Sequence, residues 1–124
     1  HPAKVFLGDV GSIPLGYLLG WLLLDLACAG AWTAAAILPL YYLADATITL
    51  ARRALRGEKV WRAHREHFYQ RAVQNGRSHA VVSAGVAVCN VLLIGLAILS
   101  ISAPWVALAA SAATVTVFLA WLSR

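Results

Sequence analysis

Two long apolar stretches, separated by a polar segment, dominate the chain. Residues 10–50 carry no charged side chain except those of Asp25 and Asp45, and residues 78–123 carry no Asp, Glu, Lys or Arg. A helix rises about 1.5 Å per residue and needs about 20 residues to cross the hydrocarbon core of a bilayer. Because each stretch is too long for one crossing, each is expected to fold into a helical hairpin.

Turn residues divide each stretch into two helices. We expect the first hairpin to turn at residues 25–30, because a carboxylate prefers the interface to the bilayer centre, and the second at residues 100–104. Ser12 is expected to cap the first helix with Pro14 in its first turn, and Pro39 to kink the second helix. The expected fold class is all-α: a polytopic membrane protein with a single membrane domain, residues 1–124, and four transmembrane helices at about residues 12–27, 31–53, 79–99 and 105–122, joined by a loop at residues 54–78.

Composition and charge agree with this topology and orient it. The chain is 61% hydrophobic and only 12% charged, with a mean hydropathy of +0.75, which excludes an ordinary soluble domain with about a quarter of its residues charged. Eight of the ten Lys and Arg residues lie between Arg52 and Arg77. Short loops rich in Lys and Arg stay in the cytoplasm, so residues 54–78, called the basic loop below, are predicted to be cytoplasmic. Counting back two helices places residues 4–12 on the same face.

The first cytoplasmic segment, Gly8-Asp9-Val10-Gly11-Ser12, leads directly into a predicted helix start. Unpaired N–H groups at a helix N-terminus favour an anion, and glycines allow a phosphate to approach the backbone. Asp9 would then be an oxygen ligand for Mg²⁺. The alternative is a glycine turn in which Asp9 and Ser12 only cap the helix. Phe6 is either a base-stacking platform or an interfacial anchor.

The basic loop contains a second cluster of candidate residues. If residues 61–71 are helical, His64, His67 and Arg71 fall within about 60° of one another beside an aromatic face. One interpretation is an amphipathic interfacial helix whose arginines reach anionic headgroups. The other is a clamp for a diphosphate or lipid phosphate, formed by Arg65 or Arg71 and the two imidazoles.

Asp45 is the remaining candidate, because a carboxylate within a transmembrane segment is costly and by default functional. It lies seven residues before Arg52, about 10 Å along a helix. At that depth it reaches cytoplasmic water or the hydroxyl of Thr49, so both a structural contact and a role in a site remain open.

Three segments in this order carry a resemblance to a known family: residues 1–12 (HPAKVFLGDVGS), residues 43–46 (LADA) and residues 63–71 (AHREHFYQR). Together they resemble the polyprenyl-phosphate N-acetylhexosamine-1-phosphate transferases, glycosyltransferase family 4. The resemblance covers nearly all 124 residues but only the C-terminal part of such an enzyme. The spacing of His64, His67 and Arg71 is similar to that of the branch that starts O-antigen or other surface-polysaccharide synthesis.

The resemblance implies an enzyme that moves a sugar 1-phosphate of the N-acetylhexosamine type from a UDP-sugar to undecaprenyl phosphate and releases UMP. It implies Mg²⁺ as cofactor, the cytoplasmic face of the bacterial inner membrane as location, a role in cell-wall or surface-polysaccharide synthesis, and no nucleic-acid partner. The catalytic residues implied are Asp9, which would ligate Mg²⁺, and His64 and His67, which would lie near the diphosphate and sugar. The implied substrate-binding residues are Phe6, which would stack on uracil, Gly8, Gly11 and Ser12, which would shape the loop, and Arg65, Arg71 and Asp45.

One departure from the family pattern limits this expectation. The family's N-terminal aspartate pair, which serves the metal and the lipid phosphate, is absent from these 124 residues, so the chain alone is expected to be inactive. The competing hypothesis is a non-catalytic membrane module whose basic loop binds anionic lipid or a partner protein.

Overall fold

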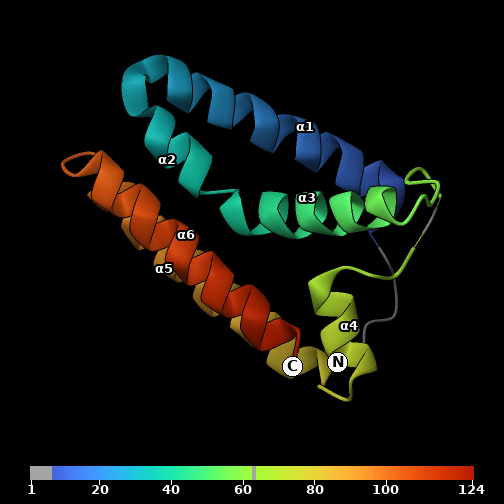
Figure 1. Ribbon diagram of the computed structural model, residues 1–124. Coiled ribbons are helices and arrows are strands. Elements are labelled where there is room, and N and C mark those ends of the chain that lie inside the picture. The colour runs from blue at the N-terminus through green and yellow to red at the C-terminus, as the bar shows by residue number, and fades with distance from the viewer. Residues whose placement is uncertain (1–6, 63) are drawn as a thin grey trace.

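The computed structural model describes residues 7–62 and 64–124, and all regular structure in these two ranges is helical (Figure 1). This confirms the all-α class. The helices are α1 (Gly8–Leu26), α2 (Trp32–Ile37), α3 (Leu40–Leu55), α4 (Phe68–Gln74), α5 (His79–Leu99) and α6 (Pro104–Leu122).

Helices α1 and α2 form the first hairpin. The chain reverses at Ala27–Ala31, where Gly30 adopts φ 94°, a backbone conformation that favours glycine. The reversal falls where the sequence predicts it. None of the 19 residues of α1 is buried, and the helix leans away from α5 and α6 in Figure 1. Its apolar side chains therefore remain available to lipid or to other protein.

The start of α1 differs from the sequence prediction. The helix begins at Gly8 rather than Ser12, so Ser12 lies inside it and does not cap it, and Pro14 follows the first turn. Gly8 has φ 62°, which places the change of direction before Asp9. Asp9 then occupies the first helical turn, where a carboxylate is favoured by the helix dipole. The predicted glycine turn at residues 8–12 is consequently helical.

The second predicted span is not one helix. Pro39 lacks an N–H donor, and the chain forms a turn at residues 38–39 between the end of α2 and the start of α3. Proline therefore interrupts the helix instead of kinking it. Helix α3 has 16 residues and ends in Arg52, Arg53 and two further residues, which makes it shorter and more polar than expected.

Within residues 7–62 and 64–124, three helical stretches are long and apolar enough to cross a membrane: Gly8–Ile37, which includes the reversal at Ala27–Ala31, His79–Leu99 and Pro104–Leu122. The protein is thus a membrane protein by its helices, but four crossings are not confirmed, because α3 does not qualify. The predicted ranges 79–99 and 105–122 agree with α5 and α6 within one residue.

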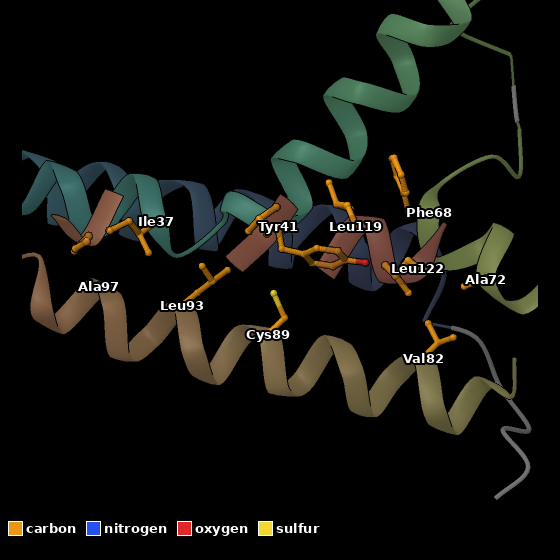
Figure 2. Packing of buried hydrophobic residues seen from close by; sticks show 13 residues of the cluster. Ile37, Tyr41, Phe68, Ala72, Val82, Cys89, Leu93, Ala97, Leu119 and Leu122 are labelled. Atoms are coloured by element: carbon orange, nitrogen blue, oxygen red, sulfur yellow. The ribbon is translucent and has the colours of Figure 1, made fainter. Parts of the chain in front are cut away.

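The core lies along the α5–α6 hairpin, whose two helices run side by side in Figure 1. Ile37 of α2, Tyr41 of α3 and Phe68 of α4 pack against it, with Leu93 of α5 fully buried among them (Figure 2). At one end of the hairpin, Arg77 donates to the backbone oxygen of Trp121 at 2.9 Å and lies 4.0 Å from the centre of its ring. These contacts hold α4 and the basic loop against the ends of α3, α5 and α6.

Candidate functional site

Asp45 is the centre of a buried polar cluster that joins α3 to α4. Its side chain is on α3 and the residue is only 4% exposed. Oδ1 accepts hydrogen bonds from Thr49 Oγ1 at 3.2 Å and from the backbone N–H of Phe68 at 3.0 Å, and it lies 3.2 Å from His67 Nδ1. A buried carboxylate requires such partners, and here they fix the start of α4 against α3.

The predicted helix over residues 61–71 is wrong over most of its length. Residues 64–67 are not helical, His67 has an extended ψ of 149°, and α4 begins only at Phe68. The reason is a hydrogen-bond acceptor on α3. The N–H groups at the start of a helix have no partner within that helix, and Asp45 accepts a hydrogen bond from one of them, the N–H of Phe68. The side-chain oxygen of Gln70 also accepts the N–H of His67 at 3.3 Å.

The two histidines of the basic loop nevertheless lie together. The ring centres of His64 and His67 are 5.0 Å apart, and the ring of Tyr69 stacks on that of His67 at 5.8 Å with an angle of 18° between the planes. The His64 ring has its Nδ1 3.3 Å from the backbone oxygen of Arg62. The two imidazoles are thus brought together by a non-helical segment, whereas the sequence predicted that a helix would do so.

A pocket of about 420 Å³ opens between α3, α4 and α5 beside this cluster. Its walls combine titratable and aromatic side chains with valines: Tyr41, Tyr42, Asp45, Ala46, His67, Tyr69, Val82, Ser83 and Val86. The hydroxyl of Tyr41 is buried and has no hydrogen-bond partner among the described residues. The pocket is therefore mostly apolar, with a few polar groups from the cluster.

Arg53 organises the first half of the basic loop. It is 5% exposed on α3, and its guanidinium donates to Glu58 Oε2 at 2.9 Å and to the backbone oxygens of Arg62 and Lys59 at 3.2 and 3.3 Å. One planar group with several donors thus closes a loop of ten residues over the end of its own helix. The sequence analysis did not single out Arg53.

The two acidic residues of the basic loop are both paired with arginines. Arg56 bridges Glu58, at 2.6 Å, and Glu66. Hydrogen bonds from Arg53 and then Arg56 lower the pKa of Glu58, and hydrogen bonds to Glu58 and then Glu66 raise the pKa of Arg56. Because these pairs use both carboxylates, the remaining cations of the loop give it a surplus of positive charge.

The residues predicted at the start of the first helix are not part of this cluster. Asp9 is exposed in the first turn of α1 and forms no hydrogen bond or ion pair with any described residue. The start of α1 and the basic loop are nevertheless at the same end of the molecule in Figure 1, opposite the turns at residues 27–31 and 100–103. Phe6, the predicted uracil contact, lies outside the described residues.

Comparison with known proteins identifies the family. A protein of Bacillus subtilis (strain 168), named probable undecaprenyl-phosphate N-acetylglucosaminyl 1-phosphate transferase, is 33% identical over 107 residues, with 83% of this chain covered. The chain belongs to the family of polyprenyl-phosphate sugar-1-phosphate transferases. It spans only 28% of the length of that transferase. No family model and no solved structure matches the chain.

The carboxylate of Asp9 has the exposure that a magnesium ligand needs. Mg²⁺ typically takes one or two carboxylates and completes its shell with water and substrate phosphates. Asp9 offers one exposed carboxylate, whereas the Asp45 oxygen that faces α4 is occupied by its three contacts. In residues 7–62 and 64–124, no three His, Cys, Asp or Glu side chains converge as a metal-binding group. Asp9 would therefore share the ion with substrate and with ligands from outside this group of residues.

Proposed function

We propose that the protein to which this chain belongs transfers an N-acetylhexosamine 1-phosphate from a UDP-sugar to undecaprenyl phosphate at the cytoplasmic face of the bacterial inner membrane. The lipid phosphate oxygen attacks the phosphorus attached to the sugar, the bond from that phosphorus to the bridging oxygen breaks, and UMP leaves with that oxygen. The observation that carries the proposal is the 33% identity to the Bacillus subtilis transferase over 107 residues.

The charge of the basic loop supports this chemistry. Two anions must approach each other, so the site needs cations that offset their repulsion. Arg65 and Arg71 have exposed side chains in the structure, and the carboxylates of the loop are bound by Arg53 and Arg56. We assign Arg65 and Arg71 to the diphosphate of the donor, because a guanidinium can bind phosphate through two parallel hydrogen bonds.

The imidazoles and the start of α1 complete the proposed assignment. His64 and His67 would contact the diphosphate and sugar from beside the pocket, and Gly8, Gly11 and Ser12 would present the first turn of α1 to the donor. Asp9 would hold Mg²⁺, which supplies neutralisation of the charge on the phosphate oxygens when it is bound.

The test measures transfer by the full-length protein, purified and reconstituted in lipid nanodiscs. Radiolabelled UDP-N-acetylhexosamine and undecaprenyl phosphate are expected to give a labelled lipid that extracts into organic solvent, together with one equivalent of UMP. Asp9→Asn is expected to abolish the product. Asp25→Asn is the matched control, because Asp25 is also an exposed carboxylate of α1 but lies at the opposite end of that helix.

Two results contradict the proposal. One is a folded wild-type protein that forms no lipid-linked sugar from any UDP-N-acetylhexosamine. The other is equal activity of the Asp9→Asn and Asp25→Asn variants. Binding of anionic vesicles by the wild-type protein without any transfer would instead support the non-catalytic membrane module.

A further inference from the structure

We propose that Asp45 is a positioning residue that fixes the orientation and the tautomer of His67, so that Nδ1 carries the proton and Nε2 is the atom available to substrate. This inference rests on the proposed function, which identifies the substrate as the UDP-sugar and undecaprenyl phosphate. The tautomer itself is a property of the folded chain and does not depend on the reaction.

The first step of the argument is the orientation of the Asp45 carboxylate. Its Oδ1 accepts the backbone N–H of Phe68 at 3.0 Å, and a backbone N–H only donates. The same oxygen lies 3.2 Å from His67 Nδ1. In the opposite tautomer, a nitrogen lone pair would face a carboxylate oxygen without a proton between them. The contact therefore selects the tautomer with the proton on Nδ1.

The second step is the restraint on the imidazole ring. Tyr69 stacks against the ring of His67, and Gln70 accepts the backbone N–H of the same residue. Asp45 is 4% exposed and anchored by Thr49 as well. The ring is consequently held through its backbone, through one face and through Nδ1, which leaves little freedom to rotate.

The third step is the position of the remaining nitrogen. The His67 side chain lines the pocket of about 420 Å³, and 24% of its surface is exposed to solvent. Its Nε2 forms no hydrogen bond with any residue in the described ranges. This nitrogen is thus the polar atom of the ring that is left to accept a proton or hydrogen bond from substrate, or to donate one when protonated. Asp45 does not contact substrate in this arrangement but acts through His67.

His64 provides an internal comparison. Its Nδ1 lies 3.3 Å from the backbone oxygen of Arg62, and a carbonyl oxygen only accepts. We therefore expect the same tautomer for His64. Its partner is a backbone oxygen, which a substitution at Asp45 does not remove. An effect of Asp45 on His67 alone therefore separates positioning from a general disturbance of the basic loop.

The experiment determines the tautomers by nitrogen-15 solid-state NMR of the histidine-labelled full-length protein in lipid bilayers, at a pH where neutral imidazole signals are observed. His67→Gln assigns the His67 signals by their disappearance. We expect the wild-type His67 to carry its proton on Nδ1, and Asp45→Ala to shift it toward the tautomer protonated on Nε2 while His64 stays unchanged. Asp45→Asn keeps an oxygen for the N–H of Phe68 and for Nδ1, so it is expected to retain the wild-type tautomer.

A proton on Nε2 of wild-type His67, or a tautomer unaffected by Asp45→Ala in a folded protein, overturns the inference. If Asp45→Ala does not fold, the wild-type and Asp45→Asn spectra still decide. In the transfer assay, Asp45→Ala is expected to lower kcat by about 10- to 100-fold, the range found when the partner that orients a metal-bound histidine is removed. KM for the UDP-sugar is expected to change little, because the arginines remain, and Asp25→Ala is expected to change neither. Loss of both kcat and donor binding to the same extent would indicate a merely structural role, whereas absence of transfer by the wild type would contradict the proposed function and leave the NMR result intact.

Discussion

Replacement of Arg53 by alanine is the sharpest test of how the basic loop is held in place. The Arg53 side chain is 6% exposed and connects the end of α3 to three later positions of the chain through hydrogen bonds, and its Nε also lies 3.7 Å from Glu66 Oε1. Alanine removes all three connections and leaves the helix itself able to form, since alanine is the best helix former. The expected result is a loop that opens while α3, α5 and α6 keep their structure.

The size of the effect follows from the three hydrogen bonds. A hydrogen bond that involves a charged group contributes about 1.5–3 kcal/mol when it is shielded, and a neutral one about 0.5–1.5 kcal/mol. The ion pair with Glu58 adds little, because 37% of that side chain is exposed and it keeps its contact with Arg56. The two bonds to backbone oxygens have a charged donor and contribute about 1.5 kcal/mol each, the lower end of the first range. The sum is about 3 kcal/mol, which corresponds to about a 100-fold increase in the equilibrium constant for loop opening.

Hydrogen–deuterium exchange with mass spectrometry measures this opening in the full-length protein in nanodiscs. Peptides from residues 56–66 are expected to exchange about 100-fold faster in Arg53→Ala, whereas peptides from α5 keep the wild-type rate. Arg52→Ala is the matched control, because Arg52 is the neighbouring residue, is exposed, and forms with the described residues a cation–π contact 5.0 Å from the ring centre of Phe68 but no side-chain hydrogen bond or ion pair. A cation–π contact at such a site contributes about 0.5–1 kcal/mol, so the control is expected to speed exchange by about fivefold at most.

Two outcomes refute this reasoning. The first is exchange of the 56–66 peptides in Arg53→Ala that stays within about threefold of the wild-type rate, which would mean that the three hydrogen bonds add almost nothing to local stability. The second is an equal acceleration in Arg52→Ala and Arg53→Ala, which would assign the effect to net charge instead of to the geometry of one guanidinium.

Three further predictions concern the metal ligand, the pH response and helix packing. Asp9→Asn is expected to abolish lipid-linked product with an unchanged circular dichroism spectrum, and product at the wild-type rate would remove Asp9 from the site. Glu58 has a lowered pKa in the folded loop, so its contribution to loop stability is present above the ordinary glutamate pKa and is lost as the pH falls through the folded value. Protection factors of residues 56–66, which correct for the slower intrinsic amide exchange at low pH, are expected to fall at acidic pH in the wild type but less in Glu58→Gln, and an equal pH dependence of the two sets of protection factors would contradict this. A Cβ added at Gly85 would lie 3.0 Å from the ring of Trp121, whereas one added at Gly95 meets nothing within 4 Å, so Gly85→Ala is expected to be about 1–3 kcal/mol less stable than Gly95→Ala in denaturant titrations, and equal stabilities would show that the ring moves aside freely.

Much of the fold could be predicted from the sequence because its signals are local. The lengths of the uncharged stretches give α5 and α6, and a glycine at residue 30 marks the first reversal. The sequence could not show how one proline or one serine affects the start or the continuity of a whole helix. Pro39 is compatible with either a kink or an interruption, and the structure has an interruption, after which α3 packs against α6. Ser12 has the properties of a helix cap, but Gly8 turns the chain earlier and the cap position moves with it.

The site was harder to predict because its decisive contacts join distant residues. Helical periodicity placed His64 and His67 on one face of a single helix, yet the helix begins one residue after His67. The cause is an acceptor on Asp45, 23 positions earlier in the chain than the N–H it receives. No pattern within residues 61–71 contains this information. The sequence analysis singled out Asp45, His64 and His67, but neither the contact between Asp45 and His67 nor the parts played by Tyr69 and Arg53.

One signal for these contacts was nevertheless present in the sequence of α3. Tyr41, Asp45, Thr49 and Arg53 follow one another at intervals of four residues and are all buried. Residues four apart lie on one face of a helix, and a stripe of polar groups on an otherwise apolar helix is stable only if another segment satisfies them. That segment must itself be polar, and the basic loop is the nearest polar part of the chain. The four-residue spacing therefore indicates that Arg53 and Asp45 lie on the same face of α3, and in the structure Arg53 binds the first half of the basic loop and Asp45 the second half.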